Sequence, residues 1–208
     1  MYSAFWGVPR APVEIGPCPV FEPEVFEETG AYRVVRAGNG VIQKEFKLQD
    51  TSIHAALYLE YPIKNRADWV RYRNERLDPH AAGRYPPADE WERLKAGWRG
   101  GDRVVSIDGG SFYGFLRDWI GMENLSLLVY DDFPLVREMM ETLADFYIAV
   151  LGKAVREARI DFAMFWEDMC YKNGPLLSPA MFRSLMLPCY RKVTDFLARN
   201  GVELSWVD

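Results

Sequence analysis

Chemically active side chains crowd into residues 165–175, which read FWEDMCYKNGP. Glu167 and Asp168 end an apolar run typical of a buried strand, on which adjacent side chains point to opposite faces. We therefore expect one of the two carboxyl groups, Glu167 ahead of Asp168, to act as a general base or to hold a cationic or N–H-bearing ligand, with Trp166 beside it. The alternative is a structural acid that accepts hydrogen bonds from backbone amides of the loop that follows.

The polar residues that follow also have two interpretations. Tyr171, Lys172 and Asn173 could orient an anionic substrate, but Asn-Gly-Pro is also an ordinary turn. Cys170 has no histidine nearby in the sequence, so a nucleophilic Cys–His pair would require a distant partner. We therefore expect this thiol to be packed or inert.

A second stretch, residues 109–119, reads GGSFYGFLRDW and follows Asp108. Its glycines precede an expected helix start, which is a place where backbone amides bind anions. The spacing matches neither the P-loop nor the dinucleotide-binding pattern. Arg117 could clamp a substrate carboxylate through two parallel hydrogen bonds, although an ion pair on the helix surface with Asp118 is the commoner arrangement.

Composition limits the class of protein. The chain has 208 residues, 49% of them hydrophobic, which suffices for one sizeable core and favours a single domain over 1–208. A formal net charge of −5 argues against a nucleic-acid or anionic-membrane partner, since either selects clustered Lys and Arg. No apolar run approaches the roughly 18 residues that a membrane span needs, so the cytoplasm is the expected location. Three scattered cysteines predict reduced thiols.

The elements that would position these groups follow from the hydrophobic pattern. Gly-Asn-Gly at 38–40 predicts a hairpin, within an elaboration over residues 20–50. Short helices are expected after Asn65, as an N-cap, and over 87–98. Strands are expected over 103–110, 160–166 and 202–208, separated by helices over 111–121, 134–159 and 179–200.

This alternation predicts parallel βα units, because parallel neighbours need a crossover connection. Acids recur at the carboxyl ends of the strands: Asp108, then Glu167 with Asp168, then Asp208. Such acids favour an α/β fold of the (β/α)8 TIM-barrel type, whose active site is built at those ends, over an open doubly wound sheet. Because a full barrel takes about 250 residues, we expect the barrel to be incomplete in this chain.

Several ordered motifs carry a family resemblance. In residues 165–208 an acid-bearing strand end is followed by G-P-x-x-S-P and then by F, L-P and Y along the next helix. GGSFYGFLRDWIG with DDFPLVREMMETLADFY precede it, and LEYPIKNRADW comes before them. In these motifs the chain resembles the uroporphyrinogen decarboxylase superfamily, well over residues 100–208 and less closely back to residue 53.

The resemblance implies a (β/α)8 barrel and one of two reactions. Some members remove carboxyl groups from the acetate side chains of the tetrapyrrole uroporphyrinogen without a cofactor. Others are methyltransferases that move methyl groups between corrinoid proteins and thiols with zinc. The loop EDMCYKNGP looks most like a branch with no assigned reaction. The implied partners are a tetrapyrrole, or a methyl donor with a corrinoid protein, and a homodimer is compatible with either.

The sequence departs from both reaction types. The Arg-rich N-terminal segment and the early-strand Asp of the decarboxylases are missing, and Phe112 stands at the Trp position of their G-x-P-W-T type run. Arg117 stands about where a substrate-contacting Tyr is expected. The zinc-binding His and cysteines of the methyltransferases would fall at or after Asp208. We therefore assign no metal ligand within these residues and expect the 208 residues alone to be inactive.

Two further interpretations lie outside this chemistry. Strand ends rich in Trp and acids also suit a glycoside hydrolase barrel, with Glu167 paired with Asp108 or Asp208 across roughly 5–9.5 Å. The other is a non-catalytic module that binds a porphyrin or corrinoid.

The site predicted from the sequence has three candidate catalytic acids, Glu167, Asp168 and Asp108. Its candidate ligand contacts are Arg117, Tyr171, Lys172, Asn173, Trp166 and Asp208.

Overall fold

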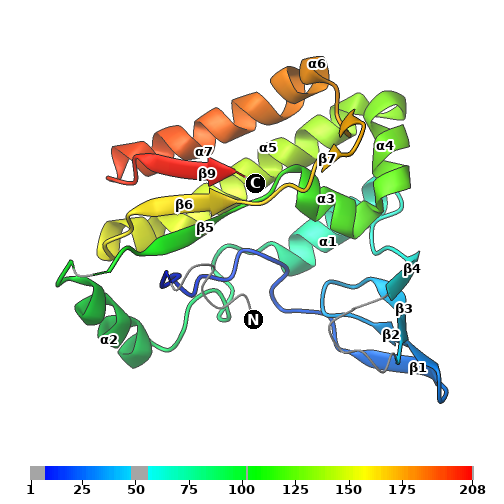
Figure 1. Cartoon of the computed structure of the whole chain (residues 1–208), viewed down its shortest axis with the longest axis horizontal. Helices are drawn as coiled ribbons and strands as arrows, with labels where there is room; N and C mark the ends of the chain where they lie inside the picture. The colour runs from blue at the N-terminus through cyan, green and yellow to red at the C-terminus, as the bar shows by residue number, and fades with distance from the viewer. Residues whose placement is uncertain (1–7, 48–55, 102, 208) are drawn as a thin grey trace.

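A computed structural model describes residues 8–47, 56–101 and 103–207 of the chain. These residues form a four-stranded antiparallel sheet, a three-stranded parallel sheet and a two-stranded hairpin. Figure 1 shows the two larger sheets at different ends of the molecule, with helices α1 and α3 between them.

The antiparallel sheet contains β1 (Glu24–Glu28), β2 (Tyr32–Arg36), β3 (Ile42–Phe46) and β4 (Ala56–Glu60) in that order. The predicted hairpin is confirmed, because β2 and β3 pair across the turn that contains Gly40. Helices α1 (Arg66–Arg76) and α2 (Ala88–Trp98) follow. The Asn65 side chain caps α1 by accepting a hydrogen bond from the Asp68 amide at 3.1 Å, as its position predicts.

The parallel sheet contains β5 (Ser106–Gly110), β6 (Phe162–Phe165) and β9 (Leu204–Val207), with β6 in the middle. Helices α3 (Tyr113–Ile120), α4 (Met122–Asp131) and α5 (Phe133–Glu157) connect β5 to β6. After β6 come a hairpin of β7 (Cys170–Tyr171) and β8 (Gly174–Pro175), then α6 (Pro179–Met181), the π-helical turn η2 (Phe182–Met186) and α7 (Leu187–Arg199). The chain thus follows the expected βα alternation from residue 106 to 207.

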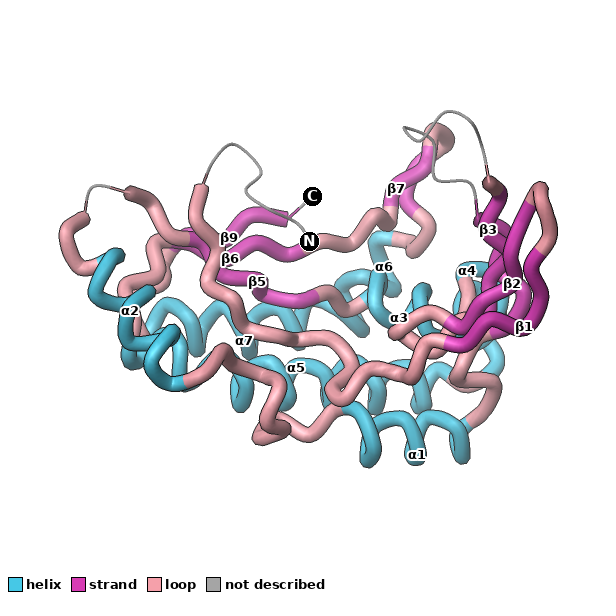
Figure 2. Tube along the Cα trace, turned by 90° about the horizontal axis from the view of Figure 1, so that it is seen from below, coloured by secondary structure: helices cyan, strands magenta, loops and turns pink. Residues whose placement is uncertain are grey.

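The main core lies between the parallel sheet and its helices. Helices α5 and α7 cover one face of this sheet (Figure 2). Ile107, Ala163 and Phe165 are at most 1% exposed, and Met140 of α5 is fully buried. On the other face Met164 is half-buried and Trp206 is 46% exposed, so that face has much less cover.

The barrel prediction is wrong. The three parallel strands form an open sheet that does not close within the described residues, and its helices α5 and α7 lie on one face. Alternating strands and helices require only that neighbouring strands be joined by a crossover, whereas closure depends on stagger and tilt summed over all strands. Acids near the strand ends therefore could not distinguish a closed sheet from an open one.

Three smaller differences concern the helices and one strand end. Helix α4 was not expected as a separate element, and it begins after Gly121, which has a φ of 92°. The helix predicted over 179–200 contains the π-helical turn η2. Asp108 lies within β5 and not at its end, because the strand continues to Gly110.

The N-terminal segment reaches the parallel sheet and is held there by a buried arginine. Arg84 is 2% exposed, and its guanidinium donates to the carbonyl oxygens of Glu14 at 3.1 Å, of Arg76 at 2.9 Å and of Gly16. Upstream of this anchor, Arg10 forms a parallel bridge with Ser106 of β5, where the Ala11 amide donates to the Ser106 carbonyl oxygen at 2.8 Å. Arg10 thereby lies beside β5, although the two are far apart in the sequence.

Candidate functional site

Glu167 lies in a buried hydrogen-bond network just after β6. Its side chain has no exposed surface and points to the N-terminus of α3. The backbone amides of residues 112–114 donate to the carboxylate at 2.9, 2.7 and 3.1 Å. The Ser111 hydroxyl donates at 2.9 Å, and the Tyr190 hydroxyl of α7 also donates. These five donors join β6 to the start of α3 and to α7.

The electrostatics of Glu167 balance two opposed effects. Burial raises the pKa of this carboxyl, and the hydrogen bonds from Tyr190 and from the amides of residues 112 and 113 act to lower it. The first turn of α3 also presents the positive end of the helix dipole, which favours an anion. The net direction is upward, because burial outweighs the hydrogen bonds, and the predicted anion-binding loop is occupied by the carboxyl group of Glu167.

This placement gives Glu167 a positioning role. Glu167 therefore matches the alternative interpretation, a structural acid that accepts hydrogen bonds from backbone amides. The one difference is that the donating amides precede β6 in the chain and do not follow it. Because no part of the side chain is exposed, a ligand could touch the carboxylate only after the network had been dismantled. The glycoside hydrolase interpretation loses support for the same reason, since it needs Glu167 as one of two accessible carboxyls.

Asp108 forms a second, separate charged group within β5. Its residue exposure is 8%, its Oδ1 accepts from the Gly110 amide at 3.0 Å, and its Oδ2 forms an ion pair with the Arg10 guanidinium. The Arg10 side chain is 34% exposed, so its outer edge remains open to solvent. The sequence patterns gave no indication of Arg10, because its contact with β5 joins two segments that lie far apart in the sequence.

Arg117 and Asp168, both predicted site residues, are in contact. Nη1 of Arg117 donates to the backbone oxygen of Asp168 at 2.9 Å, and Nη2 lies 3.5 Å from Oδ2 of the same residue. Nε of Arg117 lies 3.6 Å from Oδ1 of Asp118. Burial raises the pKa of Asp118, while Arg117 lowers it. Arg117 therefore holds the loop after β6, where Asp168 has a left-handed φ of 47°.

The remaining predicted residues are spread around this loop. Trp166 packs edge-on against Phe115, with ring centroids 5.2 Å apart. Tyr171 is 61% exposed, and Lys172 and Asn173 are exposed on the same hairpin. Cys170 was expected to be packed or inert, and it is exposed and therefore not packed. Asp208 lies outside the described residues.

An apolar pocket of about 380 Å³ adjoins the same loop. Met169, four residues past β6, lines it together with Pro175 of the hairpin. Its other wall comes from the next helical segment, in particular from Phe182, Leu187 and the exposed Arg183. Sequence reasoning missed this pocket. The signal that could have found it is the four-residue spacing of Pro179, Arg183 and Leu187, which places them on one helical face.

Two other features were sought among the described residues: a metal site and a membrane-spanning helix. Among them, no group of three His, Cys, Asp or Glu side chains is arranged to hold a metal ion. Within the same ranges, none of the helices combines the length and the apolar character needed to cross a bilayer. Comparison with protein-family models, with curated proteins and with solved structures finds no match to this chain.

Proposed function

We propose that this chain is the tetrapyrrole-binding part of a uroporphyrinogen decarboxylase-like protein, and that one edge of the ligand packs into the apolar pocket beside Arg183 while the rest of the macrocycle lies outside it. The proposal rests on this pocket, because its walls are apolar and the guanidinium of Arg183 lies among its lining groups. A tetrapyrrole with acidic side chains has matching chemistry, since its ring system is apolar and its periphery is anionic. Residues of the family-like stretch 165–208 supply the lining.

The charge at the rim supports an anionic ligand. Arg183 is exposed and forms no ion pair with any other described side chain. An arginine at the edge of an apolar pocket can bind a carboxylate through two parallel hydrogen bonds, and this pairing is stronger where apolar walls exclude water. Arg117 does not line this pocket, and its guanidinium already contacts Asp168 of the adjoining loop.

Decarboxylation would place a further demand on the chain. Loss of CO₂ from an acetate side chain breaks a C–C bond and forms a C–H bond, so a proton donor must lie near the pyrrole. Asp108 and Asp168 are the candidates among the predicted acids, because Glu167 has no exposed surface. Since one face of the parallel sheet is open to solvent at Trp206, we expect this chain alone to bind a tetrapyrrole without turnover. We also propose a cytoplasmic location, from the three free cysteines.

The proposal is tested by titrating uroporphyrin, the stable oxidised analogue, into the protein and following its Soret absorbance. We expect saturable binding that Arg183→Gln weakens by about tenfold or more, since a charge-assisted bidentate pair is lost. Arg191→Gln, which removes an exposed guanidinium from α7 outside the pocket, is the matched control and should bind like the wild type.

Absence of saturable porphyrin binding, or equal affinities of the Arg183 and Arg191 variants, would contradict the proposal. A corrinoid titrated in the same way provides a second arm. Saturable corrinoid binding without porphyrin binding would favour the methyltransferase alternative. Mass spectrometry of uroporphyrinogen after incubation would detect the loss of any carboxyl group, which is not expected from this chain alone.

A further inference from the structure

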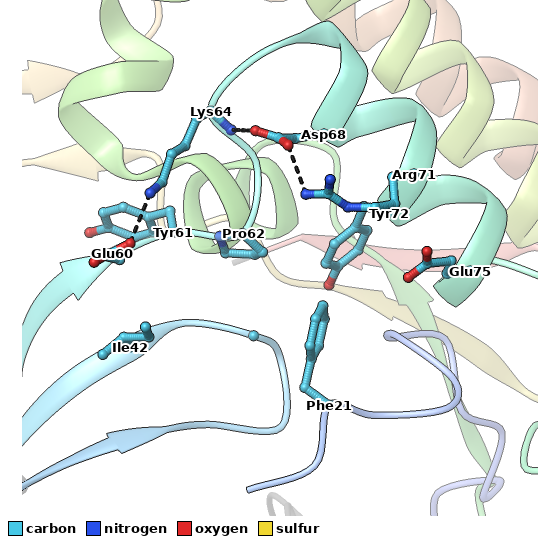
Figure 3. Close-up of a pocket in the computed structure, with 11 residues that line it drawn as sticks. Phe21, Ile42, Glu60, Tyr61, Pro62, Lys64, Asp68, Arg71, Tyr72 and Glu75 are labelled. Atoms are coloured by element: carbon cyan, nitrogen blue, oxygen red, sulfur yellow. Dashed lines mark hydrogen bonds and ion pairs between the residues drawn. The ribbon is translucent and has the colours of Figure 1, made fainter. Parts of the chain in front are cut away.

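A second pocket, of about 270 Å³, lies between α1 and the antiparallel sheet. Figure 3 shows Tyr61 and Pro62 on one side, Phe21 and Tyr72 on another, and Glu75 near one end. Much of it is built from the motif LEYPIKNRADW, which the tetrapyrrole proposal does not use. The second pocket shares no lining residue with the apolar pocket beside Arg183.

Aromatic rings form the inner wall of this second pocket. Tyr72 is 3% exposed, and its ring centroid lies 5.8 Å from that of Phe21. The guanidinium of Arg76 already lies over Phe21, 4.3 Å from the ring centroid. Burial raises the pKa of both Tyr61 and Tyr72, so both phenols are neutral at physiological pH. The wall is therefore aromatic and uncharged, and the position of Arg76 over Phe21 shows that it already accommodates one flat cation.

The rim charges favour a cation over an anion. Lys64 pairs with Glu60 at 2.8 Å, and Arg71 pairs with Asp68 at 2.7 Å, so an anion would have to displace an acid from either base. Glu75 differs from these two acids: its ion-pair contact with Arg76 is 3.8 Å long.

The guanidinium of Arg76 is committed elsewhere. It lies over the Phe21 ring and donates to the backbone oxygen of Pro19 at 3.3 Å. The Glu75 side chain is 53% exposed, so its carboxylate can accept a ligand without the loss of a short ion pair.

We propose that this pocket binds a small, flat organic cation, an amidinium or guanidinium carried on an apolar group. The cation pairs with Glu75, and the apolar part lies against Phe21, Tyr61 and Tyr72. A cavity of about 270 Å³ is at the small end of ligand sites, which suits a molecule of single-ring size. The proposal is independent of tetrapyrrole binding at Arg183.

The test is isothermal titration calorimetry with benzamidine, an aromatic amidinium, and with benzamide, its neutral isostere. We expect benzamidine to bind at least about tenfold more tightly, because only the cation gains a carboxylate partner and the attraction of the ring faces. Glu75→Gln should remove that preference. Glu203→Gln, which neutralises an exposed acid near β9, should leave it unchanged.

The proposal would be overturned by equal affinities for benzamidine and benzamide in the wild-type protein, or by a benzamidine preference that persists in Glu75→Gln. Absence of saturable benzamidine binding would overturn it as well. Because Glu75 is exposed, its replacement should not disturb folding, and circular dichroism of the variant checks this. Arg183→Gln should leave benzamidine binding intact, which separates this site from the tetrapyrrole pocket.

Discussion

Replacement of Glu167 by glutamine distinguishes a positioning carboxylate from a catalytic one. The two side chains have the same shape, but one oxygen becomes an NH₂ group that donates and cannot accept. Oε1 accepts from the amide of residue 112 and from Tyr190, whereas Oε2 accepts from Ser111 and from the amides of residues 113 and 114. Either orientation of the glutamine therefore points an N–H group at a fixed backbone amide.

The magnitude follows from these contacts. In the better orientation the NH₂ group replaces Oε1, which leaves one buried amide unsatisfied at a cost of about 1–3 kcal/mol. Three hydrogen bonds at Oε2 lose the assistance of the negative charge, each worth roughly 1 kcal/mol. The neutral glutamine is easier to bury, and this offsets part of the loss, in keeping with the direction in which burial shifts the Glu167 pKa. We expect a net loss of about 2–4 kcal/mol in the free energy of unfolding.

Urea denaturation followed by circular dichroism measures this loss. Tyr190→Phe serves as a graded comparison, since it removes one hydroxyl donor while its ring still packs against Phe112 and Phe165, and it should cost about 1–2 kcal/mol. If Glu167→Gln were within about 0.5 kcal/mol of the wild type, as for an ordinary surface substitution, the positioning role would be refuted.

Three other predictions concern two glycines, Gly110 and Gly174, and two cysteines, Cys170 and Cys189. Gly110 and Gly174 both have positive φ, but a Cβ at Gly110 would lie 2.6 Å from the Tyr147 ring, whereas one at Gly174 would meet nothing within 4 Å. Gly110→Ala should therefore cost about 3 kcal/mol and Gly174→Ala about 1–2 kcal/mol by urea denaturation, and equal losses would contradict the packing argument. Burial raises the pKa of Cys189 from 9.0 to about 11, so iodoacetamide should label exposed Cys170 first, as peptide mass spectrometry would show. The stability that comes from the protonated Cys189 thiol is complete below pH 9 and is lost as the pH rises through about 11. Cys189→Ala should therefore lose less stability at alkaline pH than the wild type. The same pH dependence in both proteins would contradict this.

Local elements of the fold could be predicted from the sequence where a single residue decides the backbone. Asn65 caps α1 as expected, and the turn at Gly40 joins β2 to β3. Strand β4 was missed because ALYLE does not alternate apolar and polar residues, and its five residues are all exposed. Helix α4 was missed because no capping side chain marks its start.

The site was harder to predict because its contacts join distant segments. The sequence indicated that Glu167 and Asp168 point to different sides, and the structure has one buried and the other exposed. It did not indicate which acid is available to a ligand, since that depends on the amides of residues 112–114, more than fifty positions earlier. The ion pair of Arg10 with Asp108 likewise joins two segments that lie far apart in the sequence.

Hydrogen–deuterium exchange with and without uroporphyrin tests the central proposal most directly, because it locates the ligand on the chain. The account predicts that bound porphyrin slows exchange in peptides that cover residues 169–187, which line the apolar pocket. Peptides that cover residues 60–75, which line the second pocket, should exchange at the same rate with and without porphyrin. Unchanged exchange over 169–187 at saturating porphyrin, or protection confined to 60–75, would contradict it.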